Sequence, residues 1–324
     1  MTTSQTSQKI TVRVQAMRFE AQGIVSVELV SPEGAELPAF AAGSHIDLHL
    51  PNGVVRSYSL SNSPLERRRY VIGVLHDRNS RGGSRYVHEQ LRVGSTIQIG
   101  APRNNFPLDE TAAHTVLIAG GIGITPIYSM LNELRRMGKS VELLYCARSR
   151  NEAAFVDQLV AEGRAQTHFN DEAGGPPDLR GYLAGKSPAA HFYCCGPTPM
   201  LNAFESICAE LKLPNVHIER FAPAEPVVAM QGSEYECQLA RSQKMVMVPA
   251  GKSLLDALLE AGIDVDHSCR EGVCGSCETA VIDGVPEHRD GVLTKAERES
   301  GKTMMVLPDS VSYTHLTLPT KRIV

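Results

Sequence analysis

Three cysteines stand within nine residues near the C-terminal end of the sequence: Cys269, Cys274 and Cys277, in the spacing C-x4-C-x2-C. The other five cysteines are scattered, so clustered metal ligation explains the run better than a disulfide framework does. This spacing is typical of a loop that wraps a 2Fe–2S cluster with thiolates aimed inward. Gly272 and Gly275 permit the backbone turns of such a loop and bring amide groups toward sulfur. Buried structural cysteines are the alternative, and a zinc site would more often show paired C-x2-C halves.

A strand, a turn and an amphipathic helix are predicted over residues 248–262, just before the cysteine loop. This region resembles the β-grasp fold of plant-type ferredoxins. The resemblance implies a fourth cysteine at or near Leu307, but no cysteine follows Cys277. Residues 311–324 look like translated sequencing-adapter read-through, so we predict that the natural terminus was lost between Val306 and Ser310. The alternative is a genuine divergent terminus in which a serine, an aspartate or a partner group is the fourth ligand.

Hydrophobic patterning divides the rest of the chain into two further blocks and a linker. Short β-like runs separated by proline and glycine predict an antiparallel β-barrel in residues 1–105. Strands alternating with helices predict a doubly wound parallel α/β domain in residues 106–222. A proline-containing segment without helical period, residues 223–234, is read as a linker to the cysteine-bearing domain at 235–310. The predicted runs are strands at 10–14, 24–30, 45–50, 70–74, 115–119, 141–145 and 191–194, and helices near 127–137, 152–162 and 199–211.

Two glycine-containing turns follow predicted strands of the α/β block. Glycines at the first turn let backbone N–H groups approach a pyrophosphate at a helix start. Together the turns resemble the NAD(P)-binding half of the ferredoxin–NADP reductase superfamily, and this resemblance puts Cys195 and Gly196 near the nicotinamide. A small buried side chain at a strand end is the alternative for Cys195, and Cys194 is read as core. The candidate residues are Gly120, Gly121, Gly123, Thr125 and Pro126 in the first turn, and Cys195, Gly196 and Pro197 in the second.

The end of the second α/β strand bears on the choice of nicotinamide cofactor. Arg148 or Arg150 could hold the 2′-phosphate of NADPH, or both could be solvated loop charges. Relatives with a similar sequence at residues 146–150 resemble NADH users, so NADH is predicted.

A short element in the barrel block, Arg56–Leu60, matches the R-x-Y-S element of the same superfamily. In that element the Tyr58 ring packs on an isoalloxazine, a serine hydroxyl (Ser59) reaches flavin N5, and Arg56 neutralises phosphate. An ordinary alternating strand is the alternative. A second flavin element is predicted where backbone amides at a helix start could bind a terminal phosphate, although a surface turn would look similar. FMN is favoured over FAD through the resemblance described next. The cofactor-binding candidates are Arg56, Ser57, Tyr58, Ser59, Gly82, Gly83 and Ser84.

The order of flavin barrel, nicotinamide sheet and C-terminal ferredoxin resembles the family of phthalate dioxygenase reductase and the vanillate demethylase reductase subunit. Residues 102–108 and Glu219–Phe221 agree with it. The resemblance implies hydride transfer from NADH to FMN, with Ser59 and Cys195 as catalytic residues. It also implies one-electron transfer through 2Fe–2S to an oxygenase subunit that carries a Rieske centre and non-haem iron. Glu219 either influences the flavin or simply ends a domain. The alternatives are an electron carrier without catalysis and a stand-alone NADH-dependent flavin or quinone reductase with a defective cluster domain.

Composition narrows the partners. A formal charge of −4 gives no basic field for nucleic acid or anionic lipid, and no apolar run is long enough to span a bilayer. The first residues lack the pattern of a signal peptide, so a cytoplasmic location is predicted. No Rieske ligand pair occurs in the sequence, which leaves the substrate to another chain.

Overall fold

The computed structural model describes residues 9–222, 234–307, 310–311 and 315–318. Two compact units make up the chain, Met1–Glu219 and Arg220–Val324. Within the described ranges, no helix is long and apolar enough to cross a membrane. Most of the predicted linker, residues 223–233, lies outside the described residues.

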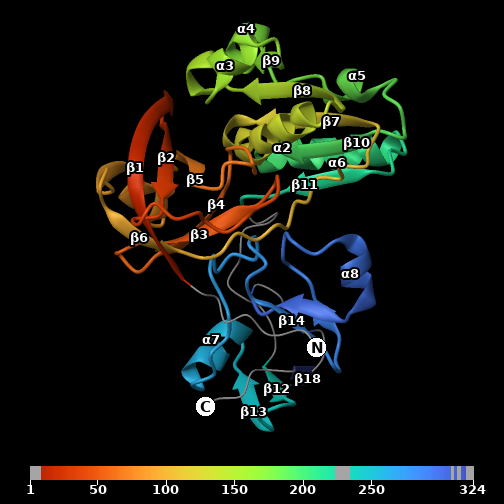
Figure 1. Ribbon diagram of the computed structural model, residues 1–324. Coiled ribbons are helices and arrows are strands. Elements are labelled where there is room, and N and C mark those ends of the chain that lie inside the picture. Colours follow the sequence, from red (N-terminus) through yellow and green to blue (C-terminus); the bar gives the residue numbers. More distant parts are fainter. Residues whose placement is uncertain (1–8, 223–233, 308–309, 312–314, 319–324) are drawn as a thin grey trace. The chain divides into compact units, whose positions relative to one another are not determined.

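The first unit begins with a six-stranded antiparallel sheet in the order β4-β3-β6-β1-β2-β5 (Figure 1). Alternate residues such as Val12, Val14 and Ile46 are fully buried, as expected when one face of each strand lines a core. A bridge between Leu60, just after β4, and Ile72, in the middle of β5, joins the two edge strands, which curls the sheet toward a barrel. The elements are β1 (Ile10–Ala21), β2 (Ile24–Val30), β3 (His45–His49), β4 (Val55–Ser59), β5 (Arg69–Leu75), α1 (Gly83–Glu89) and β6 (Thr96–Ile99).

The same unit continues into a five-stranded parallel sheet in the order β11-β10-β7-β8-β9. The chain winds outward from β7 to β9 and then returns to β10, so the topological switch point lies between β7 and β10. The strands are β7 (His114–Gly120), β8 (Ser140–Ala147), β9 (Gln166–Phe169), β10 (His191–Cys195) and β11 (Val216–Glu219). The α-helices are α2 (Ile124–Arg136), α3 (Val156–Ala161), α4 (Asn170–Ala173), α5 (Leu179–Leu183) and α6 (Thr198–Glu210).

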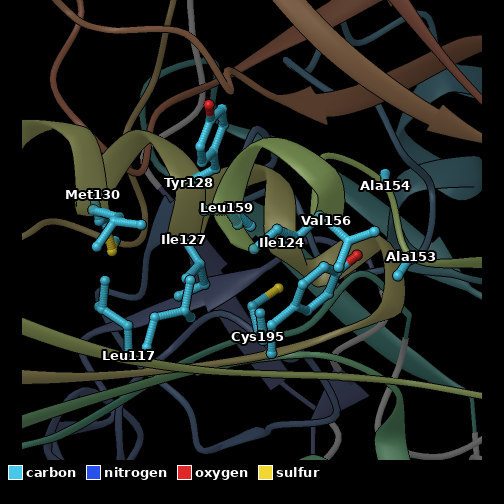
Figure 2. Packing of buried hydrophobic residues seen from close by; sticks show 14 of the residues in the cluster. Leu117, Ile124, Ile127, Tyr128, Met130, Ala153, Ala154, Val156, Leu159 and Cys195 are labelled. Carbon is cyan, nitrogen blue, oxygen red and sulfur yellow. The ribbon is translucent and has the colours of Figure 1, made fainter. Parts of the chain in front are cut away.

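Alternation along the parallel strands supplies a separate core on each face of this sheet. Figure 2 shows Ile124 and Ile127 of α2 packed over Leu117 and Cys195, which belong to one cluster. Cys194, one residue earlier on β10, joins the cluster on the other face and is fully buried, which confirms its reading as core. Buried aliphatic side chains on both faces are what parallel strands covered by helices require.

The second unit is built from short strands and two helices around one apolar cluster. Helix α7 begins at a cap in which Ser253 Oγ accepts a hydrogen bond from the Asp256 backbone N–H, and α8 begins at a Thr294–Glu297 capping box. The strands form the sheets β13-β12-β18, β14-β16 and β15-β17. The elements are β12 (Tyr235–Leu239), β13 (Lys244–Val248), α7 (Leu254–Glu260), β14 (Glu278–Ala280), β15 (Pro286–Glu287), α8 (Lys295–Ser300), β16 (Thr303–Met305), β17 (Ser310–Val311) and β18 (His315–Leu318).

The predicted fold class is confirmed in its antiparallel flavin-type sheet and its parallel α/β sheet, and the second unit is a small β domain. The helix predicted near residues 152–162 is shorter than expected. Phe155 adopts a left-handed conformation with φ of 60°, so α3 starts at Val156 after a separate 3-10 turn at Arg150–Glu152. The four-residue strands β6, β9 and β11 escaped sequence prediction because so few residues show no clear period. The foreign origin of residues 311–324 stays a prediction.

Gly43 gives a test of how the barrel meets the start of the α/β domain. A Cβ atom built on Gly43 would lie 2.0 Å from the Phe106 carbonyl oxygen, and Gly43 has φ of +90°. Gly34 has φ of +74° with nothing within 4 Å of its Cβ position, so Gly34→Ala is a matched control for backbone strain alone. We expect urea unfolding to show a loss of about 1 kcal/mol for Gly34→Ala and at least about 3 kcal/mol for Gly43→Ala. Equal losses would contradict the close approach.

Candidate functional site

Strand β4 presents the predicted flavin residues on alternate faces. Its antiparallel register with β3 puts Ser57 opposite Asp47 and Ser59 opposite His45. Ser57 Oγ donates to Asp47 Oδ1 at 2.6 Å, so this hydroxyl is engaged within the protein. Tyr58, on the opposite face, packs against the barrel core, and burial raises its pKa to about 12.

The two predicted flavin elements come together at the start of α1. A Cβ atom on Gly83 would lie 2.6 Å from Arg56 Cγ, so the arginine stem runs directly against this glycine. Gly82 has φ of +102°, which favours glycine. Within residues 9–222 we find no hydrogen-bond partner for the backbone amides of Gly83 and Ser84. A guanidinium beside two open amides fits the phosphate group of a flavin nucleotide.

The two glycine turns of the α/β domain interlock at the switch point between β7 and β10. A Cβ on Gly120 would lie 2.6 Å from Met200 Sδ, and one on Gly123 would lie 2.2 Å from the Cys195 carbonyl oxygen. Gly196 is equally tight, with Gly120 Cα 3.1 Å from its Cβ position. These glycines therefore have a structural reason, the contact between turns, beyond the approach of a pyrophosphate. Gly121 differs from them: nothing lies within 4 Å of its Cβ position, and its φ of +53° is the reason that glycine is favoured there.

Thr125 and Pro126 lie in the first turn of α2, directly after this crossing. Thr125 Oγ1 donates to the Ile122 carbonyl at 3.0 Å and is buried, so the hydroxyl stabilises the turn itself. Its methyl group faces the barrel, because a Cβ on Gly73 of β5 would lie 2.7 Å from Thr125 Cγ2. The turn predicted to bind the nicotinamide, at the start of α2, thus lies against a glycine of the six-stranded antiparallel sheet.

Ser59 and Cys195, the two predicted catalytic residues, meet around Glu219. Cys195 and Glu219 are register partners on β10 and β11, and Ser59 Oγ donates to Glu219 Oε2 at 3.4 Å. Burial raises the pKa of Glu219 to about 8, and the hydrogen bond from Ser59 offsets this in part. Burial, followed by the charge of Glu219, raises the pKa of the Cys195 thiol well above its usual value. At neutral pH the Glu219 carboxyl and the Cys195 thiol are therefore both protonated and uncharged.

Glu219 is the residue that sequence reasoning left undecided. Its signal in the sequence was a charged side chain in the segment Glu219–Phe221 that closes the α/β block, but a domain-end glutamate looks the same in sequence. The register between β10 and β11 decides its position beside Cys195. In the second unit, His267 Nδ1 forms a hydrogen bond with the Val265 carbonyl at 2.8 Å.

The cysteine loop of the second unit buries all three thiols. Positive φ angles at Arg270, Gly272 and Gly275 turn the backbone, and the Glu271 amide donates to Cys269 Sγ at 3.3 Å. Ser268 Oγ, next to Cys269, is buried without a partner among the described residues, so it is a further donor available to sulfur. Iron–sulfur clusters are bound by cysteine thiolates whose sulfur atoms accept hydrogen bonds from nearby donors, and this loop provides both kinds of group.

The ring of ligands is one thiol short in the described residues. Cys277 Sγ lies 3.4 Å from the Leu307 carbonyl oxygen, and the Val306 amide donates to the Cys277 carbonyl at 3.1 Å. Leu307 thus stands beside the third cysteine, buried at 8% exposure, without a thiol to offer. Among the described residues no group of three or more His, Cys, Asp and Glu side chains is gathered closely enough for a single metal ion. The loop thus brings together Cys269, Cys274 and Cys277, the three residues predicted to bind a 2Fe–2S cluster.

Comparison with known proteins identifies two of the three blocks. Residues 117–206 match the model of the oxidoreductase NAD-binding domain, and residues 237–307 match that of the 2Fe-2S iron-sulfur cluster binding domain. The chain is 46% identical over 319 residues to phenoxybenzoate dioxygenase subunit beta of Ectopseudomonas oleovorans, covering 98% of this chain and 99% of that protein. It is 44% identical over 301 residues to vanillate O-demethylase oxidoreductase of a Pseudomonas species, covering 89% and 93%.

Solved structures agree. The crystal structure of phthalate dioxygenase reductase, described as a modular structure for electron transfer from pyridine nucleotides to [2Fe-2S], superposes with a TM-score of 0.73 at 35% identity. It is covered completely, over 98% of this chain. The chain belongs to the family of phthalate dioxygenase reductase and the vanillate demethylase reductase subunit. An intact type IV self-sufficient cytochrome P450 monooxygenase gives a TM-score of 0.87 at 38% identity, and the reductase spans 41% of that longer chain.

Family membership confirms the predicted class of activity. The reductase is an NAD(P)H-dependent oxidoreductase, the reductase component of an oxygenase system, with flavin, NAD and 2Fe–2S domains. The fold class predicted from sequence is that of the family. The individual site residues and domain boundaries are not tested by this likeness and stay predictions.

Gly73 tests the seating of the nicotinamide turn on the flavin sheet. Gly73→Ala adds a methyl group 2.7 Å from Thr125 Cγ2, so the turn must shift. Because a misplacement of about 1 Å between reacting groups can slow a step by roughly 100-fold, we expect flavin reduction by saturating NADH to slow at least about tenfold in stopped-flow absorbance. The control is Gly175→Ala, whose Cβ position has nothing within 4 Å. An unchanged rate in Gly73→Ala would show that the contact has no bearing on transfer.

Glu219 predicts a pH dependence of stability. Its pKa of about 8 lies above the value near 4.3 of an unfolded glutamate. Between these values the unfolded chain releases a proton that the folded chain keeps, so the free energy of unfolding falls as pH rises. Glu219→Gln removes this loss. We expect the Tm of the flavin-free wild type to fall relative to that of Glu219→Gln between about pH 5 and pH 8. Parallel melting curves across this range would refute the raised pKa.

Proposed function

We propose that this reductase takes a hydride from NADH onto FMN and delivers the electrons singly to an oxygenase that carries a Rieske centre and non-haem iron. The observation that carries the proposal is the meeting of Ser59, from the flavin-type sheet, with Glu219 and Cys195 at the ends of the last two parallel strands. Flavin and nicotinamide sites must share one wall for hydride transfer, and these side chains come from both domains.

Flavin chemistry supplies the change from two-electron to one-electron transfer. Arg56 and the open amides of Gly83 and Ser84 hold its phosphate, with Gly82 permitting the turn. FMN is proposed rather than FAD because the chain resembles phthalate dioxygenase reductase, with its C-terminal 2Fe–2S domain. Tyr58 orients the ring system, and Ser59 presents its hydroxyl to it. Ser57 acts indirectly, since its hydroxyl is bonded to Asp47.

The nicotinamide turns position NADH. Gly120, Gly121 and Gly123 with Thr125 and Pro126 shape the first turn; Cys195, Gly196 and Pro197 shape the second. Arg150 is bound to Asp157 at 2.7 Å, and its guanidinium lies over the Phe169 ring at 5.9 Å. This ion pair is exposed and therefore weak, so it does not decide between the nicotinamides; NADH is proposed because the relatives with similar sequence resemble NADH users.

Glu219, Ser59 and Cys195 set the charge and the packing at the proposed site of hydride transfer. With a pKa of about 8, Glu219 keeps its proton at neutral pH and can exchange it through the Ser59 hydroxyl. Cys195 stays a neutral thiol and fills the strand end without adding charge. A neutral wall suits a hydride donor and acceptor, because an unpaired buried charge there would be costly.

We further propose that the cluster domain of this chain lacks its fourth ligand, at Leu307. Its place beside Cys277 supports the assignment, and Cys269, Cys274 and Cys277 are the remaining ligands. The second candidate function, an NADH-dependent flavin or quinone reductase with a defective cluster domain, gains support from the same position. A relative 47% identical over 296 residues is tetrachlorobenzoquinone reductase of Sphingobium chlorophenolicum.

The partner and location follow the same reasoning. The relatives' names point to an oxygenase as electron acceptor, and the charge of −4 gives no basic field for nucleic acid or membranes. We propose a cytoplasmic location, where thiols stay reduced, because the clustered cysteines are better explained by metal ligation than by disulfides.

Two electron acceptors test the proposal on the purified chain. Ferricyanide takes electrons from reduced flavin directly, whereas cytochrome c reduction by this class depends on a one-electron cluster. We expect NADH–ferricyanide turnover with FMN as the released flavin, and poor cytochrome c turnover. No flavin, or no NADH oxidation with either acceptor, would overturn the proposed activity.

Leu307→Cys tests the missing ligand. We expect this variant to gain two irons per chain, the visible absorption and low-temperature paramagnetic signal of a 2Fe–2S centre, and at least about tenfold faster cytochrome c reduction. Val306→Cys, one position earlier, is the matched control and should gain neither. If the unmodified chain already binds two irons stably, or if Val306→Cys does as well as Leu307→Cys, the assignment of Leu307 is wrong.

A further inference from the structure

A partly buried ion pair, in which Asp47 is buried and Arg103 is half-buried, lies beside the strand β4 and has no role in the function described above. Asp47, in the middle of β3, is 4% exposed, and its Oδ2 lies 2.8 Å from Arg103 Nη2. Its other oxygen accepts the 2.6 Å hydrogen bond from Ser57 Oγ. Arg103 belongs to the 102–108 segment that sequence analysis singled out without assigning a task.

The backbone explains how Arg103 reaches Asp47. Arg103 and His45 exchange two hydrogen bonds, His45 N to Arg103 O at 2.8 Å and Arg103 N to His45 O at 3.0 Å. Asn104 Nδ2 fixes the next residue to the Ala42 carbonyl at 3.0 Å. His45 and Asp47 are two residues apart on one strand and share a face, so the arginine side chain runs along that face past His45.

The network lies directly across from the flavin residues of β4. Ser57 is the register partner of Asp47 and Ser59 that of His45. Paired residues of neighbouring antiparallel strands point to the same side, so Ser57, Ser59, Asp47 and His45 line one face. The Ser57–Asp47 bond thus fixes the strand midway between Arg56 and Ser59, the residues proposed to hold the two ends of the flavin.

The charges of the network balance at neutral pH. Burial, then the charge of Arg103, lowers the pKa of His45 to about 4, so this imidazole is neutral. Burial alone would raise the pKa of Asp47, but Arg103, Ser57 and His45 together hold it below its usual value. Loss of one partner would leave an uncompensated charge at low dielectric, where its field reaches further than in water.

One donor of the network is still open. Arg103 Nε is buried without a hydrogen-bond partner among the described residues. This donor is open to a bound group or to a water molecule, so the network has room for one further polar contact.

We propose that the Asp47–Arg103 pair is a positioning device for the flavin strand whose charge balance sets the reduction potential of the bound flavin. The inference rests on the proposed flavin site. Removing the carboxylate charge leaves the arginine charge unopposed, which favours the electron-rich reduced flavin. Asp47→Asn keeps one oxygen, which can accept from Arg103, and places an amide N–H beside Ser57, whose hydroxyl can accept it, so both hydrogen bonds can be kept while the charge is removed.

The experiment is a titration of the flavin-free full chain with FMN, oxidised and reduced, together with the midpoint potential of bound FMN. We expect Asp47→Asn to raise the ratio of the oxidised to the reduced dissociation constant about tenfold, an upward shift of ~30 mV for the two-electron couple. The double variant Asp47→Asn/Arg103→Gln should return toward the wild-type potential, because both charges are gone. Arg103→Lys keeps the charge, so it should keep the potential while binding FMN more weakly.

Glu210→Gln is the matched control, since it removes one carboxylate from an exposed ion pair with Arg180 and should leave the ratio unchanged. Less than a twofold change of the ratio in Asp47→Asn, or an equal change in the double variant, would overturn the inference. Wild-type protein that binds no FMN would instead refute the proposed flavin site. If Asp47→Asn does not fold, the Arg103→Lys comparison decides: a potential that shifts although the charge is retained contradicts tuning by charge.

Discussion

The crossing of two backbone turns at the switch point of the parallel sheet is the constraint on which the site depends. Gly120 and Gly123 approach Cys195 and Gly196 more closely than any side chain would allow. This contact ties the end of β7 to the end of β10, and β10 in turn carries Glu219 beside it through the pairing with β11. Because the two turns pack directly against each other and follow paired strands, the side chains that project from them are held in defined positions relative to one another. The same turn rests on Gly73 of the flavin sheet, so one rigid point serves both domains.

Much of the architecture could be predicted from sequence because it depends on local patterns. The long alternating run of β2 and the apolar run of β7 follow directly from side-chain period, and the cysteine spacing marks its loop without reference to the rest. Short edge elements such as β11 could not, since four residues give no period. Arg56 and Gly83, found separately in sequence, are joined by packing between β4 and α1.

The parts that sequence could not give are those created by register. Whether Ser57 contacts a cofactor or a neighbouring strand depends on which residue stands across from it, and that residue is Asp47. Glu219 likewise has its meaning from the strand beside it rather than from its own neighbours in sequence. Position 307 was found from family spacing, but its closeness to Cys277 rests on the ladder between β14 and β16.

The parallel pairing of β18 with β12 has a consequence for how the second unit tolerates change at its end. β12 is bonded to β13 along one edge and to His315–Leu318 along the other. Backbone hydrogen bonds of this kind do not depend on side-chain identity, and a vacant strand edge invites pairing with any extended segment. The edge of β12 therefore pairs with His315–Leu318 through backbone hydrogen bonds, and this pairing would accept other side chains at these four positions.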